Sequence, residues 1–473
     1  MDPLPQQAIH PGRTYRANGV RIDPLTTAQA RRRVAPSFWT GDVPDFAHHL
    51  RGGRRADGPR AVGTPTPSPE PAEILDGPAV WCGFLADHFG HFVAEHAPRL
   101  LFSRLERPDD TFLFMLRPWV NEAAVPTWFW DILDWYGVPR EQVAFVTSRP
   151  VFVRELRILP QAEHLTVGPA REYLDALDDH TRPMLPAGPP DGTLFVSRAG
   201  MNLRLGGERY LEDRLRAAGV TVIRPEAAPL REQLDLYASA RTIIFSEGSA
   251  MHGRQLLGRI DQDVSVLVRR KGKHVGRVLL EDRVRTLDYL DTLVGNLPFS
   301  VDASGRPAMY HAFPLADQQA LVEAFDKHGV DLSGSWSESA FEQSQKEDLE
   351  NWASWVSQGS RAGSGLEARA RLLQGALAAV GQLSRSGSLV KIAESIAAQK
   401  AAEATGAEQV TAAPDTIPAR RDSEDALRDR ISVLQRRLDQ IEHSRTWRAT
   451  TPARRVGSFL HHTARSLRRR TTR

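Results

Sequence analysis

The feature that most constrains the fold is the alternation of short apolar runs and helical segments between residues 193 and 290. Parallel strands that helices cover on both faces read as nearly continuous apolar runs. Such runs, separated by helices, are typical of a parallel sheet with crossover connections. The pattern predicts a doubly wound α/β domain over residues 190–330. The expected strands are TLFVSR (193–198), VTVIRP (220–225), RTIIFS (241–246), DVSVLV (263–268) and VRTLDYL (284–290), and the expected helices cover 208–218, 230–238 and 249–257.

A second α/β pattern precedes this domain, over residues 76–185. The stretch PMLPAGPPDG (183–192) lies between the two and predicts a domain boundary. Residues 1–75, which include GTPTPSPEPAE (63–73), predict an irregular lead-in. The expected strands of this first domain cover 79–85, 111–116, 143–147 and 151–160, and its expected helices cover 89–105, 122–136 and 168–182.

The C-terminal third of the chain predicts helices and a tail rather than a further sheet. A helix is expected at 315–328, and Ala, Gly, Ser and Gln predict a helical and low-complexity linker over 331–421. A seam within 422–443 predicts either a short coiled coil, and with it a homo-oligomer, or an amphipathic helix that packs on the protein itself. The seam consists of Leu427, Ile431, Leu434, Leu438 and Ile441, spaced 4, 3, 4 and 3.

The positive charge of the chain is concentrated in its last residues, 444–473. The formal net charge is +3, and removing the nine arginines from Arg445 onward leaves −6 for the rest. A basic body would favour nucleic acid as a partner. A basic tail that also carries Trp447 and Phe459 instead favours an anionic membrane surface. The alternative is a disordered basic tail.

The compartment is indicated by cysteine usage and by the absence of targeting patterns. The single cysteine, Cys82, cannot form an intrachain disulfide, which favours a reducing compartment. We find no signal-peptide pattern and no run of about 20 apolar residues that would span a bilayer. The sequence therefore predicts a cytoplasmic protein that is peripheral at the inner face of the cell membrane.

The stretch FSEGSAMHG (245–253) ends an expected strand with a carboxylate, a glycine and a serine. A nucleophilic serine would favour the spacing Gly-x-Ser-x-Gly, but Gly248 directly precedes Ser249 and Gly253 comes too late. A glycine and a helix-capping serine after a parallel strand instead favour a ligand turn, with a plain strand-to-helix turn as the alternative. In a ligand turn, Glu247 would suit hydrogen bonds to sugar hydroxyls.

The stretch DHFGHFVAEHAPRL (87–100) places His88, His91 and Glu95 on one face of the expected helix. The spacing differs from the zinc motifs HExxH and HxxEH, so we expect no metal here. A general base, His91, oriented by Glu95, fits better. The alternative is a helix N-terminus whose polar groups are simply satisfied.

Two arginines, Arg198 and Arg204, follow the expected strand 193–198 in the stretch FVSRAGMNLRLGGER (195–209). The planar guanidinium binds diphosphates in a bidentate manner, so both are candidate anion ligands. The alternative is a pair of surface arginines.

Three blocks of the sequence together resemble glycosyltransferase family 61. They are G-H-F-x-x-E-x-x-x-R-L at 90–100, V-S-R-x(5)-R-x-x-x-E at 196–208, and L-R-E-Q-x-x-L-Y-A-S-A-R-T-I-I at 230–244 followed by E-G-S-A-M-H. The resemblance covers residues 80–291 and implies a GT-B-like architecture of two Rossmann-like domains. It further implies an inverting enzyme that uses a nucleotide-sugar donor and no metal or other cofactor. The tail stretch SRTWRATTPARR (444–455) is similar to a segment that bacterial glycosyltransferases often carry.

By this resemblance, each candidate residue has an expected role. His91 would be the catalytic base with Glu95 as its neighbour. The donor side would comprise Arg198, Arg204, Glu208, Glu247, Gly248, Ser249 and His252. The chain departs from the eukaryotic relatives at Glu247, where they have a His, at His252, where they have a nearby Asn, and at Gly207, where an Asn is usual. These departures bear on which sugar the donor carries.

The sequence thus predicts a glycosyltransferase that adds a sugar to a surface glycan such as capsule, exopolysaccharide or lipopolysaccharide. Its expected partners are the nucleotide-sugar, a glycan or lipid-linked glycan acceptor and an anionic membrane, but no nucleic acid. Two other functions remain open on the sequence alone. One is a non-catalytic scaffold with the same fold, and the other is an esterase or acyltransferase that uses Ser249.

Overall fold

A computed structural model describes residues 14–27, 37–39, 71–85, 88–159, 161–163, 168–300, 312–357 and 372. The chain divides into two units, residues 1–399 and 400–473, and every described residue belongs to the first. The expected seam at 427–441 and the basic tail at 444–473 lie outside the described residues.

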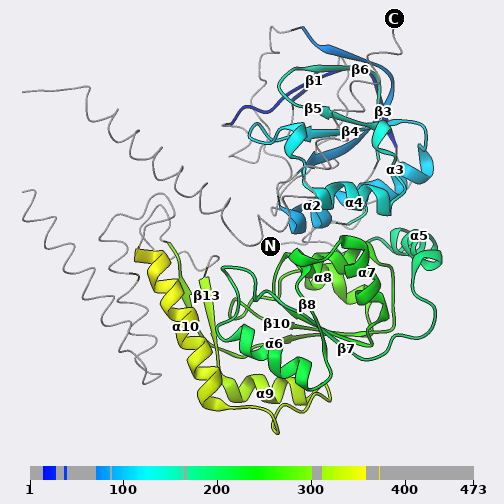
Figure 1. Ribbon diagram of the computed structural model, residues 1–473. Coiled ribbons are helices and arrows are strands. Elements are labelled where there is room, and N and C mark those ends of the chain that lie inside the picture. Colours follow the sequence, from blue (N-terminus) through cyan, green and yellow to red (C-terminus); the bar gives the residue numbers. More distant parts are fainter. Residues whose placement is uncertain are drawn as a thin grey trace, which may run out of the picture. The chain divides into compact units, whose positions relative to one another are not determined.

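The first sheet has six strands in the order β2-β1-β6-β3-β4-β5 (Figure 1). Strands β6, β3, β4 and β5 run parallel, whereas β1 pairs antiparallel with both β6 and β2. The chain proceeds outward from β3 through β4 to β5 and then returns to the other side of β3. The strands are β1 (Tyr15–Asp23), β2 (Ser37–Trp39), β3 (Glu73–Leu85), β4 (Thr111–Leu116), β5 (Val143–Val146) and β6 (Val151–Ile158).

Part of the lead-in that was expected to be irregular is a strand of this sheet. β1 pairs with β6 along most of its length, and β3 begins at Glu73 rather than near residue 79. In β1, Ala17, Val20 and Ile22 are buried while Arg16 and Asn18 are exposed. A half-buried antiparallel strand alternates apolar and polar residues, so it lacks the apolar run by which the other strands were predicted.

The second sheet has five strands, all parallel, in the order β11-β10-β9-β7-β8. This confirms the predicted mixed α/β fold with parallel sheets. The strand order reverses between β7 and β9, which are neighbours: β8 is added on one side of β7, and β9, β10 and β11 are then added on the other side. The strands are β7 (Thr193–Val196), β8 (Thr221–Ile223), β9 (Thr242–Ser246), β10 (Asp263–Leu267) and β11 (Thr286–Leu290).

Two of the expected helices differ from the prediction. The helix expected at 89–105 is interrupted after Glu95, because Pro98 has no N–H with which to continue the hydrogen-bond ladder. The helix expected at 249–257 is the 3-10 helix η8, which packs between α2 and α7 with most of its residues buried. Tertiary packing overrides helix propensity there. The α-helices up to residue 280 are α2 (Phe89–Glu95), α3 (Leu100–Glu106), α4 (Thr127–Trp135), α5 (Arg171–Thr181), α6 (Glu208–Ala217), α7 (Leu230–Ser239) and α8 (Arg277–Leu280), and the 3-10 helices include η8 (Ser249–Leu256) and η9 (Glu281–Arg283).

Beyond the second sheet the chain forms a small addition that the sequence predicted only in part. The helix expected at 315–328 is α9 (Gln318–Asp326), and the side chain of Asp317 caps it at Ala320 N. The hairpin β12 (Leu293–Pro298) and β13 (Ala312–Ala316) precedes it. A 20-residue helix, α10 (Glu338–Ser357), lies within the expected linker and packs against α6 (Figure 1).

The two sheets share one hydrophobic core. A single cluster of buried side chains contains Phe92 and Phe114 from the first sheet's region and Ile243 and Phe245 from the second. Trp135 Nε1 donates a hydrogen bond of 2.9 Å to the Leu256 carbonyl across this boundary. Within the residues that the structure describes, no helix is long and apolar enough to cross a bilayer.

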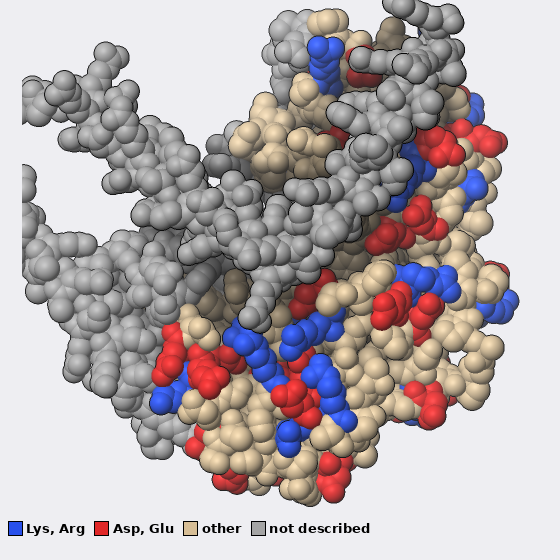
Figure 2. Space-filling model, in the orientation of Figure 1, with Lys and Arg blue, Asp and Glu red and all other residues tan. Residues whose placement is uncertain are grey.

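A buried ion pair adds to this shared core. Glu163, which follows β6, accepts a hydrogen bond of 2.7 Å from Arg283 in η9, and both side chains are buried. The surface is different in character: on the face shown in Figure 2, basic and acidic side chains are interspersed.

Candidate functional site

The candidate residues follow strands at the point in each sheet where the strand order reverses. In open α/β sheets, ligands bind outside the carboxyl ends of the strands at such a switch point. In the second sheet this point lies between β7, which leads to Arg198, and β9, which leads to Glu247 and Gly248. In the first sheet it lies between β3 and β6, and α2 follows β3.

Helix α2 carries His91 and Glu95 as a hydrogen-bonded pair. His91 Nδ1 lies 2.6 Å from Glu95 Oε1, with the Glu95 side chain 5% exposed and that of His91 25% exposed. A carboxylate at Nδ1 holds the proton on that nitrogen and leaves Nε2 as the acceptor. The imidazole is therefore partly accessible, with one nitrogen able to take a proton. This is the geometry that a general base requires.

His88 connects α2 to the turn after β9. Its Nδ1 accepts a hydrogen bond from the His91 backbone N–H at 3.4 Å, which caps the helix. Because Nδ1 acts as an acceptor, Nε2 carries the proton and donates to Ser249 Oγ at 3.1 Å. The serine hydroxyl is then free to donate its own hydrogen to a ligand. In a nucleophilic Ser–His pair the imidazole must instead accept the serine proton, so this arrangement does not favour an esterase.

The N-terminal half of α2 packs tightly against η8. A Cβ atom on Gly90 would lie 2.9 Å from His252 Cδ2 and 3.2 Å from Ser249 Cα, so only glycine permits the contact. His252 is buried there, with Nδ1 2.9 Å from Gln255 Oε1, and burial lowers its pKa to about 4. His252 is therefore neutral at physiological pH and packs behind Ser249.

Gly248 allows the side chain of Arg198 to approach the backbone after β9. Its φ of −178° is extended and open to any residue. A Cβ atom there, however, would overlap Arg198 Nη1 and lie 2.8 Å from Cζ and 2.9 Å from Cδ. Gly248 is the N-cap of η8 without a side-chain bond, so the expected capping by Ser249 is not found. The space beside Gly248 that a side chain would fill is occupied by Arg198.

Two arginines that the sequence analysis missed, Arg269 and Arg270, complete this region directly after β10. Glu247 is buried and accepts a hydrogen bond from Arg269 N at 2.7 Å and another from Arg270 Nε at 2.8 Å. The sequence analysis expects this carboxylate to suit hydrogen bonds to sugar hydroxyls. In the structure it binds the loop that follows β10. The available signal was the same as for Arg198, namely arginines that come immediately after a buried parallel strand.

The guanidinium of Arg269 is mostly buried, and two of its nitrogens, Nε and Nη1, make no hydrogen bond within the described structure. The pKa of Arg269 is lowered to about 10, mainly by burial and also by the neighbouring charges of Arg198 and Arg270, while the charges of Glu247 and Glu208 act in the opposite direction. Burial also lowers the pKa of Arg198. The carboxylates of Glu208 and Glu226 also act on Arg198, so the costly feature here is the two unbonded nitrogens of Arg269 rather than an excess of charge. Buried donors of a guanidinium are costly unless a ligand accepts hydrogen bonds from them. This end of the second sheet is therefore suited to bind an anion.

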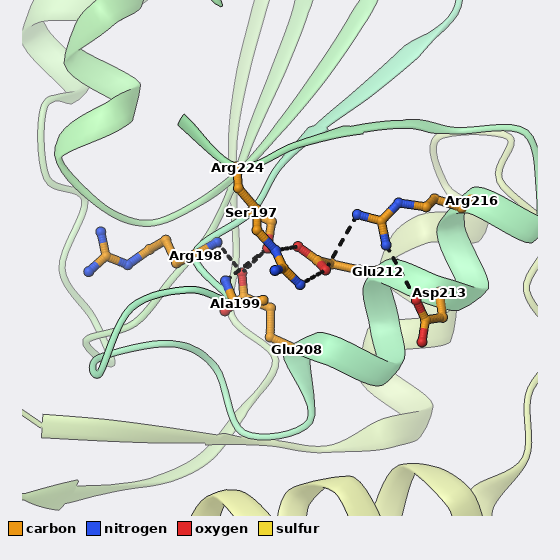
Figure 3. A network of polar contacts seen from close by, with 8 residues as sticks. All are labelled: Ser197, Arg198, Ala199, Glu208, Glu212, Asp213, Arg216 and Arg224. Atoms are coloured by element: carbon orange, nitrogen blue, oxygen red, sulfur yellow. Dashed lines mark hydrogen bonds and ion pairs between the residues drawn. The ribbon is translucent and has the colours of Figure 1, made fainter. Parts of the chain in front are cut away.

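The two remaining candidates, Glu208 and Arg204, have structural partners. Glu208 is buried and accepts hydrogen bonds from Arg198 N and Leu205 N, both at 2.7 Å, and from Ser197 Oγ at 3.2 Å. The side chain of Arg198 extends away from this network (Figure 3). Arg204 is paired with Asp348 of α10 through Nε, at 3.0 Å, and through Nη2. The sequence analysis expects Arg204 to face a diphosphate; in the structure its guanidinium is held by Asp348.

A series of contacts connects Arg198, after β7, with His91 of α2. Arg198 lies against Gly248, Ser249 bonds His88, and the rings of His88 and His91 are 4.9 Å apart. Within the described part of the chain, no group of three or more His, Cys, Asp or Glu residues could hold a metal ion. The positive charge in the site comes from arginines.

Comparison with known proteins places part of the chain in a family. Residues 89–254 match the protein-family model named Glycosyltransferase 61. The search of curated proteins gave no match. The matched region includes α2, the loop with Arg198 and the turn at 247–249, whereas Arg269, Arg270 and α10 lie beyond it.

Proposed function

Given that residues 89–254 identify the chain as a glycosyltransferase of family 61, we propose that it is an inverting enzyme that uses a nucleotide-sugar donor. The acceptor is a glycan or lipid-linked glycan of the cell surface. The proposed architecture is of the GT-B type, in which the first sheet supplies the base and the acceptor side and the second sheet binds the donor.

The observation that carries this proposal is the group of Arg198, Arg269 and Arg270 at the carboxyl ends of β7 and β10. A nucleoside diphosphate carries its charge on oxygens that guanidinium groups bind in a bidentate manner. Arg269 still has two N–H groups to donate, and the Ser249 hydroxyl hydrogen can point to the same ligand. The charge that develops on the leaving diphosphate would be stabilised there.

The proposed reaction is a single displacement at the anomeric carbon. His91 Nε2 takes the proton of the acceptor hydroxyl as its oxygen bonds the anomeric carbon, and the bond from that carbon to the diphosphate oxygen breaks with both electrons going to the diphosphate. Glu95 stabilises the imidazolium that forms. Attack on the face opposite the leaving group inverts the configuration. In this scheme the arginines supply the positive charge that a divalent metal would otherwise provide.

The partner and location follow from the sequence. We propose that the basic tail at 444–473 holds the enzyme at an anionic membrane, where a lipid-linked acceptor would be found. The seam at 427–441 is the proposed contact of a homo-oligomer.

The test compares donor binding with turnover. A thermal-shift screen with nucleoside diphosphates and nucleotide sugars first identifies the donor, and activity is then measured with and without a metal chelator. His91→Ala should lower kcat by about 10² to 10⁴ while donor affinity is kept, because only the base is removed. Glu95→Gln should lower kcat with the same selectivity, because Gln can donate to Nδ1 and so favour the wrong tautomer.

Three results would contradict the proposal. Near-normal turnover of His91→Ala would remove the base from its assigned role. A complete absence of nucleotide-induced stabilisation would favour a non-catalytic scaffold. Labelling of Ser249 by a serine-reactive phosphonate would favour an esterase.

A further inference from the structure

We propose that Asp348, on helix α10, is a positioning residue for the donor side of the site. It holds the loop 198–207 in the conformation that presents Arg198 to the donor diphosphate. The inference rests on the proposed function and extends it to a helix that lies outside the family match.

Both carboxylate oxygens of Asp348 bind this loop. Oδ1 accepts hydrogen bonds from Arg204 Nε, at 3.0 Å, and from Arg204 Nη2, and Oδ2 accepts one from Gly207 N at 2.9 Å. The Asp348 side chain is 5% exposed, so water screens these bonds little. One carboxylate on α10 thus fixes two points of a loop that is 141 to 144 residues away in the sequence.

A short series of hydrogen bonds connects Asp348 to Arg198. Arg204 Nη1 donates to the Met201 carbonyl at 3.1 Å, and Met201 N donates to the Arg198 carbonyl at 2.7 Å. Glu208 binds the same loop from its other side, at Arg198 N and Leu205 N. The backbone of Arg198 is therefore held from both sides by two buried carboxylates.

The glycine pair before Glu208 lets α10 come close enough for this contact. A Cβ atom on Gly206 would lie 3.2 Å from both Gln345 Cγ and Phe313 Cζ. Gly207 has a φ of +81°, which disfavours other residues, and a Cβ atom there would lie 2.5 Å from Phe341 Cε2. Phe341 belongs to the core on this side of the second sheet. Gly206 and Gly207 thus form the surface on which α10 docks.

A purely stabilising role would be a weaker account of this arrangement. A buried ion pair often contributes little net stability, because the cost of desolvating both charges offsets their attraction. A ligand-binding side chain, by contrast, must be held within about 0.5 Å of its productive position. The bidentate contact from Arg204 and the backbone contact at Gly207 provide that restraint for the loop that carries Arg198.

The experiment compares Asp348→Asn with Glu347→Gln in the full-length protein. Glu347 is the adjacent, exposed residue of α10 and accepts a hydrogen bond of 3.1 Å from Gln343 Nε2 of the same helix, so its substitution is the matched control. The dissociation constant of the nucleoside diphosphate that stabilises the wild type is measured by calorimetry, together with Tm, kcat and both KM values. Asp348→Asn should weaken diphosphate binding and raise donor KM by about 10- to 100-fold. Glu347→Gln and the acceptor KM should be unchanged.

A second variant keeps the test valid if Asp348→Asn folds poorly. Arg204→Met with Asp348→Leu replaces the buried pair by apolar residues, which is often neutral for stability. A variant with a wild-type Tm and weakened diphosphate binding supports the positioning role. In an Arg198→Ala background, neither change should weaken binding further, because the residue that the loop positions is already gone.

The outcomes separate this inference from the function on which it rests. If the wild type binds no nucleoside diphosphate, the proposed function fails. If the wild type binds one and a folded Asp348→Asn or Arg204→Met/Asp348→Leu protein binds it equally well, only the positioning role is overturned. The positioning role would also be overturned if the Asp348 variants weakened diphosphate binding by the same factor in the wild type and in the Arg198→Ala background.

Discussion

Substituting alanine at Gly248 should remove the function of Arg198 without changing Arg198 itself. The added Cβ would overlap Nη1 of Arg198 and lie 2.8 Å from its Cζ, so the guanidinium must leave its position. The backbone can accept the change, because φ at Gly248 is −178° and alanine adopts extended conformations. The atoms that must move belong to one flexible side chain, from Cδ of Arg198 outward, and no backbone atom is displaced, so we expect a loss of stability of about 1 kcal/mol.

The magnitude of the binding defect follows from the bonds that are lost. A hydrogen bond to a charged group contributes about 1.5–3 kcal/mol, which corresponds to about 10- to 150-fold in affinity. Gly248→Ala should therefore weaken binding of the nucleoside diphosphate by about that factor, measured by calorimetry. Gly295→Ala is the control, because a Cβ atom on this strand glycine meets nothing within 4 Å.

The decisive measurement is a double-mutant cycle with Arg198→Ala. If Gly248→Ala acts only by displacing Arg198, it should have no further effect on binding once Arg198 has been removed. Full additivity of the two losses would show that Gly248 acts by another route. Wild-type affinity in Gly248→Ala would refute both the clash and the role assigned to Arg198.

The remaining predictions concern stability. Glu163→Ala should lower the free energy of unfolding by about 3–5 kcal/mol in urea, because it leaves Arg283 buried without its partner, whereas Asp76→Ala, at an exposed pair, should cost less than about 1 kcal/mol. A loss below about 1 kcal/mol at Glu163 would contradict this. Burial lowers the pKa of His252 to about 4 and that of His96 to about 3. The unfolded chain therefore binds more protons below about pH 6.5, and stability should fall by about 2 kcal/mol per histidine between pH 7 and 5. In urea titrations at several pH values, His252→Gln should reduce the fall in the free energy of unfolding between pH 7 and 5. An unchanged fall would show that His252 does not contribute to the pH dependence.

The sequence was most informative where both faces of a strand are buried. The inner strands β7, β9 and β10 were predicted because residues such as Phe195, Ile244 and Val266 give nearly uninterrupted apolar runs. β1 was missed because only one of its faces is buried, and the alternation of Ala17 with Arg16 and Asn18 is weak over nine residues. The 3-10 geometry of η8 results from its packing between α2 and α7, which local sequence does not encode.

The candidate site was predictable where function follows from position relative to a strand. The pairing of His91 with Glu95 follows from their spacing on a helix. Arg198 is a candidate because it follows the carboxyl end of β7. Arg269 could have been found by the same rule. The partners of Arg204 and Glu247 could not have been predicted in this way. Arg204 binds Asp348 and Glu247 binds Arg270, and only the tertiary structure brings these residues together. The roles in catalysis remain predictions.

The core that the two sheets share limits how this enzyme can be recombined. Because Phe92 and Phe245 belong to one cluster and Glu163 bonds Arg283, neither sheet with its helices buries its own apolar surface completely. A fragment that ends in the loop 183–192 would expose the side that contacts η8. Chimeras that exchange the second sheet and its helices between relatives would then fold only if the residues on both sides of this boundary are exchanged as matched sets. Ligand specificity at the second sheet is therefore more readily altered by substitutions at the strand ends than by exchanging the whole sheet with its helices.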